Sequence, residues 1–257
     1  MGTVRYTWED MELFSRASHD HSRLHMSKEY ARQTSYGRPI VFGILGAFAA
    51  LGALNDRRGW WLTSARLDYR RPFDLDTNYR LEAKEPGPER GSVALKDAEG
   101  VILSATFSFD EARDPGGCFQ AGDGIAPLRE QRTWESDELK PGVRVGGRYA
   151  PPRDAFETLV ARWGLAAKGV QAPQIAVFLW SSFLTGMHLP GLHGTSAGFR
   201  VTFDPGTSGG AVPFDYDTTI QGFDDRFRLL TTTTILSGRG GPFAAAEVVA
   251  HVRDPRG

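Results

Sequence analysis

The sequence predicts an α+β fold in which a buried helix precedes an antiparallel sheet, and the same plan occurs twice. The first observation is a wholly apolar stretch, residues 43–54, followed by four segments rich in aromatic and β-branched residues. The second is a repeat of this order, with an apolar stretch at 174–189 and four strand-like segments after it. Because a helix that is apolar all round must be buried on every side, each sheet is expected to wrap around its helix.

The composition is that of an ordinary folded protein and argues against several classes. The 257 residues are 40% hydrophobic and 24% charged, and the net charge of -1 gives no general affinity for nucleic acid. A single cysteine excludes an internal disulfide framework and a cysteine-based zinc site. The first residues lack the apolar core of a signal peptide, and the apolar stretches are too short or too interrupted to cross a bilayer. We therefore expect a soluble cytoplasmic protein with no membrane or nucleic-acid partner.

In the first half, cap and turn residues mark the ends of the elements. Thr7 as N-cap, with Asp10 three residues later, predicts a short amphipathic helix, and Ser27 caps a further helical turn or two. The histidine-rich run between them, 19–25, is expected to be non-helical. Pro39 disfavours helix at the residue before it, and the apolar helix is expected to begin at Gly43. Turn residues separate the predicted strands, which are 60–69, 79–84, 92–96 and 101–109.

A change of composition separates the two halves. Residues 113–142 contain few apolar side chains and several glycine and proline turns, which predicts a linker between domains at 1–112 and 143–257. The second domain is expected to begin with a helix at 154–163, and Pro173 stands at a favourable first-turn position of its apolar helix. Its strands are predicted at 199–203, 216–221, 227–235 and 244–252.

The residues that indicate chemistry lie between 19 and 43. Three of the six histidines fall in the run 19–25, where Asp20 and His25 are five residues apart, and Gly43 heads the apolar helix shortly afterwards. A carboxylate, an imidazole and a helix start are the parts of an acid–base site with an oxyanion donor. Taken alone, each residue also has a structural explanation. Asp20 could be the cap of a helix, and His25 could be a half-buried histidine with no catalytic role. The spacing of His21 and His25 matches metal-binding helices, but no third ligand beyond Asp20 is evident, so we predict no metal.

Residues 14–48 resemble the MaoC-like dehydratases, a family that includes the R-specific enoyl-CoA hydratases. That family has a Gly-Asp-x-Asn-Pro-(aliphatic)-His segment, which reads here His19-Asp20-His21-Ser22-Arg23-Leu24-His25. Its second segment, of the Pro-Ile-Val-His-Gly type, reads Pro39-Ile40-Val41-Phe42-Gly43. The departures are His19 for glycine, Ser22 for asparagine, Arg23 for proline and Phe42 for histidine. The resemblance implies a double hot-dog fold, with two curved antiparallel sheets that each wrap around one long helix, the second half being degenerate.

The resemblance also implies an activity, which is reversible syn elimination of water from a (3R)-3-hydroxyacyl thioester. The thioester would be carried by coenzyme A or by an acyl carrier protein, as in fatty-acid or polyketide metabolism, and no cofactor is implied. In dehydration His25 would act as base and Asp20 as acid, while the Gly43 N–H stabilises the oxyanion. Ser22 would orient a neighbouring group, and Phe42 would line the acyl pocket and favour a bulky chain.

Other readings of the chain remain open. A hot-dog thioesterase would also use a carboxylate and a helix N-terminus, and a non-catalytic acyl-thioester-binding protein would tolerate the departures from the motif. The second half is expected to complete the pocket without catalytic residues. His188, His193 and His251 are interpreted as isolated polar residues, and the pairs Arg57-Arg58 and Arg70-Arg71 as solvated charge rather than phosphate ligands. The protein would be a monomer with a double hot-dog or a homodimer.

Overall fold

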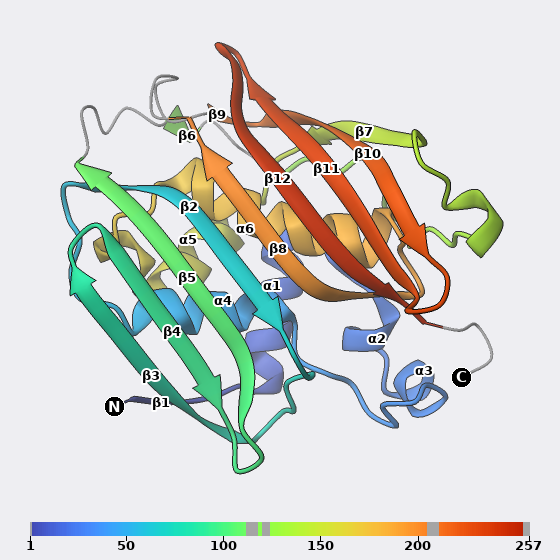
Figure 1. Cartoon of the computed structure of the whole chain (residues 1–257), viewed down its shortest axis with the longest axis horizontal. Coiled ribbons are helices and arrows are strands. Elements are labelled where there is room, and N and C mark those ends of the chain that lie inside the picture. The colour runs from blue at the N-terminus through green and yellow to red at the C-terminus, as the bar shows by residue number, and fades with distance from the viewer. Residues whose placement is uncertain (1, 112–117, 120–123, 205–210, 254–257) are drawn as a thin grey trace.

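A computed structural model describes residues 2–111, 118–119, 124–204 and 211–253. Its centre is a ten-stranded antiparallel sheet in the order β1-β3-β4-β5-β2-β8-β12-β11-β10-β7, with the two apolar helices packed against one face (Figure 1). Two short strands pair in parallel apart from this sheet. The strands are β1 Gly2–Arg5, β2 Trp60–Tyr69, β3 Asn78–Gly87, β4 Arg90–Lys96, β5 Val101–Glu111, β6 Cys118–Phe119, β7 Arg144–Tyr149, β8 Gly194–Phe203, β9 Ala211–Val212, β10 Phe214–Asp224, β11 Leu229–Gly238 and β12 Gly241–Val252.

The two predicted halves share this sheet, because β2 of the first half pairs with β8 of the second. The antiparallel register runs from Ser64 opposite Thr202 to Asp68 opposite Gly198. Each half contains an edge strand, then helices, then four further strands of this sheet. The α+β plan with two helix-plus-sheet units is therefore confirmed.

The sequence analysis did not predict the edge strands β1 and β7. β1 has four residues, of which three are exposed, so it lacks the alternation of buried and exposed side chains that marks a longer strand. β7 contains Gly146 and Gly147, and glycine is depleted in strands. Both strands exist because a neighbouring strand, β3 or β10, supplies their hydrogen-bond partners.

The helices agree with the cap residues of the sequence in most places. Thr7 and Asp10 form the predicted capping box, and the Ser27 side chain accepts the Tyr30 N–H. The α-helices are α1 Trp8–Ser18, α2 Arg23–Met26, α3 Lys28–Arg32, α4 Gly43–Gly52, α5 Arg153–Arg162 and α6 Ala172–Phe183. Short 3-10 turns occupy Ser136–Glu138 and Leu165–Ala167. Among the described helices, none has both the length and the hydropathy that a bilayer crossing requires.

Two predictions about helices were wrong. Residues 19–25 are not entirely non-helical, because α2 forms one turn that includes His25. The second apolar helix does not continue regularly to residue 189, since α6 ends at Phe183 and a π-helical turn follows at Leu184–His188. In that turn the Leu189 N–H donates to the Leu184 carbonyl, five residues back, which widens the backbone.

The predicted linker is packed against the second half where the structure describes it. Arg132 exchanges backbone hydrogen bonds with Met187 and Leu192, and the Trp134 indole N–H donates to the His188 carbonyl. Residues 113–117 and 120–123 lie outside the described residues. The domain boundaries at 112 and 143 stay a prediction.

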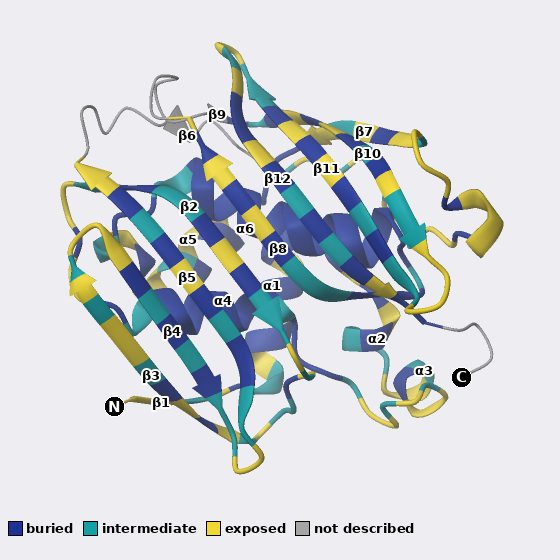
Figure 2. Cartoon of the chain, viewed as in Figure 1, coloured by how far each residue is buried: buried dark blue, intermediate teal, exposed yellow. Residues whose placement is uncertain are grey.

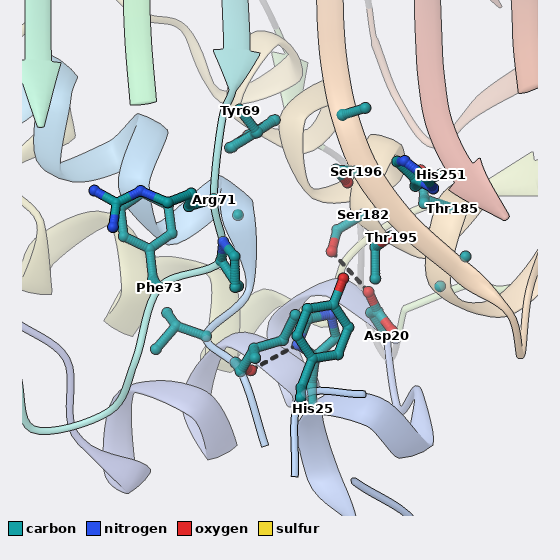
Figure 3. Close-up of a pocket in the computed structure, with 18 of the residues that line it drawn as sticks. Asp20, His25, Tyr69, Arg71, Phe73, Ser182, Thr185, Thr195, Ser196 and His251 are labelled. Atoms are coloured by element: carbon teal, nitrogen blue, oxygen red, sulfur yellow. Dashed lines mark hydrogen bonds between the residues drawn. The ribbon is translucent and has the colours of Figure 1, made fainter. Parts of the chain in front are cut away.

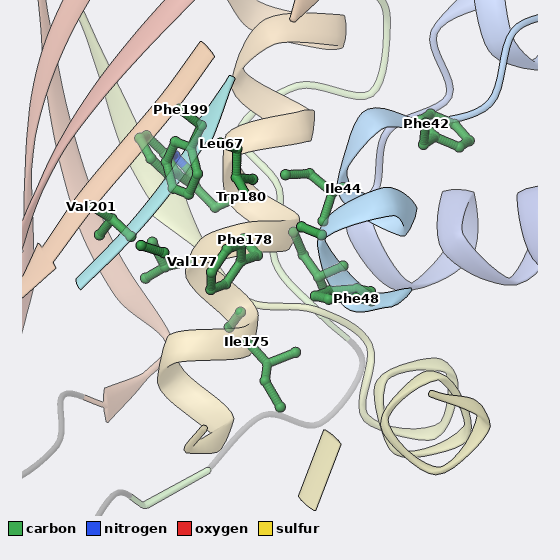
Figure 4. Close-up of a cluster of buried hydrophobic side chains, with 14 of the residues drawn as sticks. Phe42, Ile44, Phe48, Leu67, Ile175, Val177, Phe178, Trp180, Phe199 and Val201 are labelled. Carbon is green, nitrogen blue, oxygen red and sulfur yellow. The ribbon is translucent and has the colours of Figure 1, made fainter. Parts of the chain in front are cut away.

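The core forms where α4 and α6 meet beneath the sheet. Strand residues alternate between buried and exposed, and the buried side faces these helices (Figure 2). Phe178 of α6 packs against Phe199 of β8 at 5.6 Å between ring centroids and against Phe48 of α4 at 6.2 Å (Figure 4). Because both helices are almost wholly apolar, burial on all sides removes most of their surface from water.

Gly46 sets how closely α4 approaches the sheet. A Cβ atom at this position would lie 2.7 Å from the Phe73 ring and 3.1 Å from the Leu103 side chain, both of which are buried. Real Cβ atoms essentially never stand this close to a neighbour, so any side chain here forces the helix or the ring to move.

We predict that Gly46→Ala lowers the free energy of unfolding by about 1–3 kcal/mol through overpacking. The loss should exceed the gain of about 1 kcal/mol that alanine brings to a helix. Urea denaturation measures it, and a double-mutant cycle with Phe73→Leu should show a smaller loss in the second background. A Gly46→Ala variant as stable as the unmodified protein would contradict the close contact.

Candidate active site

A cavity of about 140 Å³ lies at the junction of the two halves and contains three of the five predicted site residues (Figure 3). Asp20, His25 and Gly43 all line it. The remaining lining comes from both halves and consists of Tyr36, Ile40, Val41, Tyr69, Arg70, Arg71, Pro72, Phe73, Ser182, Thr185, Gly186, Gly194, Thr195, Ser196, Ala197 and His251.

Asp20 follows directly on the C-terminal end of α1. His19 caps that helix in the left-handed conformation, with φ of 56°, which is the conformation that the family glycine would adopt most easily. Histidine tolerates this region better than bulky or β-branched residues do, and its Nε2 lies 3.0 Å from the Ala150 carbonyl oxygen. The departure at residue 19 therefore preserves the turn that brings Asp20 inward.

The carboxylate of Asp20 is buried, and each of its oxygens accepts a hydrogen bond. The Ser22 backbone N–H donates to Oδ1 at 3.0 Å, and the Ser182 hydroxyl of α6 donates to Oδ2 at 2.7 Å. Gly186, in the π-helical turn, packs against the same group, since a Cβ there would lie 2.5 Å from Oδ1. These two hydrogen bonds fix the orientation of the carboxyl group in the cavity.

His25 presents an unprotonated ring nitrogen for proton transfer. Its Nδ1 lies 2.7 Å from the Ile40 carbonyl oxygen, which can only accept, so Nδ1 carries the proton and Nε2 has a free lone pair. Burial lowers the pKa of His25, an effect that the Asp20 carboxylate and the Ile40 carbonyl oppose in part and that the Arg253 charge reinforces. The imidazole is therefore neutral near pH 7.

Gly43 is the first residue of α4, so its N–H has no acceptor within the helix. The positive end of the helix dipole adds to the attraction that this N–H exerts on an anion. A Cβ atom at Gly43 would lie 2.9 Å from the Tyr69 ring, which explains why a residue without a side chain stands here.

Ser22 and Phe42 do not belong to the cavity lining, contrary to the sequence prediction. Ser22 contributes its backbone N–H to Asp20, while its own hydroxyl is buried without a hydrogen-bond partner among the described residues. Phe42 is fully buried behind the cavity, with its ring 4.2 Å from that of His25 and 4.6 Å from that of Phe14. It supports the imidazole from behind and forms no wall for an acyl chain.

Several lining residues were missed or misread from the sequence. Ser182 gave no signal because it stands inside an apolar stretch, 162 residues from the carboxylate that it contacts. His251 is not isolated, since it lines the cavity at the end of β12. Arg71 also lines the cavity and pairs with Asp97 at 2.7 Å. Arg57 is not solvated but buried, in an ion pair with Glu85 at 2.5 Å.

His21 and His25 are spaced as in metal-binding helices, but their side chains do not come together in the structure. His21 is exposed, and its Nδ1 lies 2.8 Å from the hydroxyl of the buried Ser15 of α1, whereas His25 lines the cavity. Within the described ranges, no group of three or more histidine, cysteine, aspartate or glutamate side chains is arranged to hold a metal ion.

No protein-family model and no curated protein matches the chain, but solved structures do. A MaoC-like dehydratase aligns with a TM-score of 0.69 at 12% identity, over 98% of this chain and 96% of that one. The tesB protein of Mycobacterium avium subspecies paratuberculosis gives 0.54 at 17%, over 84% and 88%. A hot-dog protein of unknown function from Alicyclobacillus acidocaldarius gives 0.52 at 12%, over 94% and 98%. The chain therefore has the double hot-dog fold that the MaoC-like dehydratases share, as the sequence resemblance predicted.

Proposed function

We propose that the protein is a hydratase or dehydratase that interconverts a (3R)-3-hydroxyacyl thioester and the corresponding 2-enoyl thioester. The observation that carries this proposal is the lining of one cavity by Asp20, by His25, whose Nδ1 is engaged by the Ile40 carbonyl, and by the helix start at Gly43. These are the base, the second proton-transfer group and the oxyanion donor that the reaction needs.

The first chemical requirement is removal of the proton next to the thioester carbonyl. That carbon is weakly acidic, and it loses a proton readily only if the charge on the carbonyl oxygen is stabilised. The Gly43 N–H and the N-terminal end of α4 supply this stabilisation, and the neutral His25 accepts the proton at Nε2.

The second requirement is a proton for the departing hydroxyl group. The side chain of Asp20 lies in the cavity, where an oxygen of its carboxyl group accepts a hydrogen bond from the substrate hydroxyl. The proton that His25 has taken then passes to the leaving oxygen, directly or through Asp20, and water departs. The α hydrogen and the hydroxyl leave from one face, both side chains return to their starting state, and hydration follows the reverse order.

The thioester carrier is coenzyme A or an acyl carrier protein. Both present the acyl group on the same pantetheine arm, so a coenzyme A ester serves as the test substrate for either. A hot-dog thioesterase is the competing function, and the tesB protein is one of the structural neighbours. The paired Asp20 and His25 favour hydration, because hydrolysis on this fold does not need a histidine beside the carboxylate.

We expect the purified protein to hydrate a short-chain or medium-chain 2-enoyl-coenzyme A, observed as loss of the ultraviolet absorbance of the conjugated thioester. Asp20→Asn and His25→Gln should each lower kcat by roughly a hundredfold or more. His21→Gln is the matched control, because His21 stands outside the cavity, and it should retain activity. Release of free thiol would instead identify a thioesterase, and no change in either thioester would favour a binding protein.

The pH dependence of kcat/KM should follow the fraction of His25 that is neutral. Because burial lowers the pKa of this imidazole below its ordinary value of about 6.5, the base stays available as the pH falls through 6.5. The acid limb of kcat/KM for hydration should therefore lie below pH 6.5. A pH–rate profile measures this, and an acid limb above the ordinary imidazole value would show that His25 is not held neutral as described.

Ser182 should act as a positioning residue, since it holds the carboxylate of Asp20 from the other half of the chain. Ser182→Ala removes one of two donors and lets the carboxylate turn, so kcat should fall by about tenfold or more while KM changes little. Ser181→Ala is the matched control, because the hydroxyl of this neighbouring residue donates to the Phe178 carbonyl within α6 and not to Asp20. Equal kinetics for both variants would argue against a role for Ser182.

A further inference from the structure

Tyr69 stands beside the helix start that the proposed reaction uses. It is the last residue of β2, opposite Leu103 of β5, and it lines the cavity. A Cβ atom built on Gly43 would lie 2.9 Å from the ring of Tyr69 and 3.3 Å from its hydroxyl oxygen. The phenol therefore fills the space where a side chain at residue 43 would stand.

The hydroxyl of Tyr69 is buried and has no hydrogen-bond partner among the described residues. Other buried tyrosines do have one, since the Tyr149 hydroxyl donates to the Ser18 carbonyl and the Tyr216 hydroxyl bonds His188. Tyr6 also lacks a partner, but it lies in the core among Phe73 and Tyr79, outside the cavity lining. Among the tyrosines that the structure describes with a buried hydroxyl and no partner, Tyr69 is the one that lines the reaction cavity.

The state of this phenol suits a hydrogen-bond donor. Burial raises the pKa of Tyr69 far above the neutral range, so the hydroxyl keeps its proton throughout the pH range of activity. An unsatisfied buried hydroxyl is costly in a folded protein, and an acceptor on a bound molecule would remove that cost.

We propose that the Tyr69 hydroxyl is a second catalytic donor to the thioester carbonyl oxygen, next to the Gly43 N–H. This inference rests on the proposed hydratase function. In Figure 3 Tyr69 lies on one side of the cavity, and Asp20 and His25 lie on the other. A thioester bound with its carbonyl toward Tyr69 thus presents its second and third carbon atoms to the acid–base pair. No proton leaves the phenol, which stabilises the enolate oxygen by hydrogen bonding alone.

Tyr69→Phe tests the proposal, with Tyr6→Phe as the matched control. Both variants remove a buried hydroxyl that has no partner among the described residues, so neither should lower the thermal unfolding temperature. Loss of one oxyanion donor should reduce kcat for 2-enoyl-coenzyme A hydration by about a hundredfold in Tyr69→Phe only. Unchanged kcat in Tyr69→Phe, in an active preparation, would overturn the role of Tyr69 and leave the proposed function standing.

A spectroscopic readout decides the same point without turnover. In the Asp20→Asn background, the carbonyl stretching band of a bound 2-enoyl-coenzyme A should shift to higher frequency when Tyr69→Phe is added, because the oxygen loses a donor. An unchanged band would overturn the inference. If the unmodified protein converts neither the 2-enoyl nor the 3-hydroxyacyl thioester, the hydratase proposal fails. In that case the carbonyl band of the bound 2-enoyl thioester, measured with and without Tyr69→Phe, still shows whether the Tyr69 hydroxyl binds the carbonyl oxygen.

Discussion

The rest of the site depends on burying the carboxylate of Asp20 at the junction of the two halves. A buried charge is tolerated only when hydrogen-bond donors replace the water that it loses. Here one donor is the backbone of its own turn at Ser22, and the other is the hydroxyl of Ser182 from the second half. Gly186 keeps the space beside the carboxylate free of side chain. The second half is thus part of the site.

The continuous sheet explains how Asp20 and Ser182, which are far apart in the sequence, come within hydrogen-bonding distance. Pairing of β2 with β8 fixes the two halves edge to edge, and α4 and α6 then pack against each other beneath the joint. A second contact between the halves lies among the helices, where Arg162 of α5 forms an ion pair at 3.0 Å with the buried Asp10 of α1. Since α1 leads directly to Asp20, this contact also helps to fix where the carboxylate enters the cavity.

The electrostatic character of the cavity differs between its two sides. On one side, the Asp20 carboxylate accepts hydrogen bonds from two donors, and burial lowers the pKa of His25, whose Nδ1 is engaged by the Ile40 carbonyl. On the other side are hydrogen-bond donors, the Gly43 N–H and the Tyr69 hydroxyl. An acyl thioester has a complementary pattern, with an electron-rich carbonyl at one end and acidic or hydroxylated carbon atoms next to it. This match, rather than the fold, is the basis on which we propose hydration chemistry.

The sequence by itself determined the two apolar helices, eight of the long strands, the caps of α1 and α3, and the group of Asp20, His25 and Gly43. These depend on periodicity, on turn residues and on a motif within 24 residues, all of which are local. Only the tertiary structure decided that Phe42 lies behind His25, that β1 and β7 complete the sheet, and that Ser182 and Tyr69 reach the cavity. The reason is physical: Ser182 in an apolar helix and Tyr69 at a strand end look like ordinary core residues. Their partners are set by how the helices and the sheet pack, which local sequence patterns do not encode.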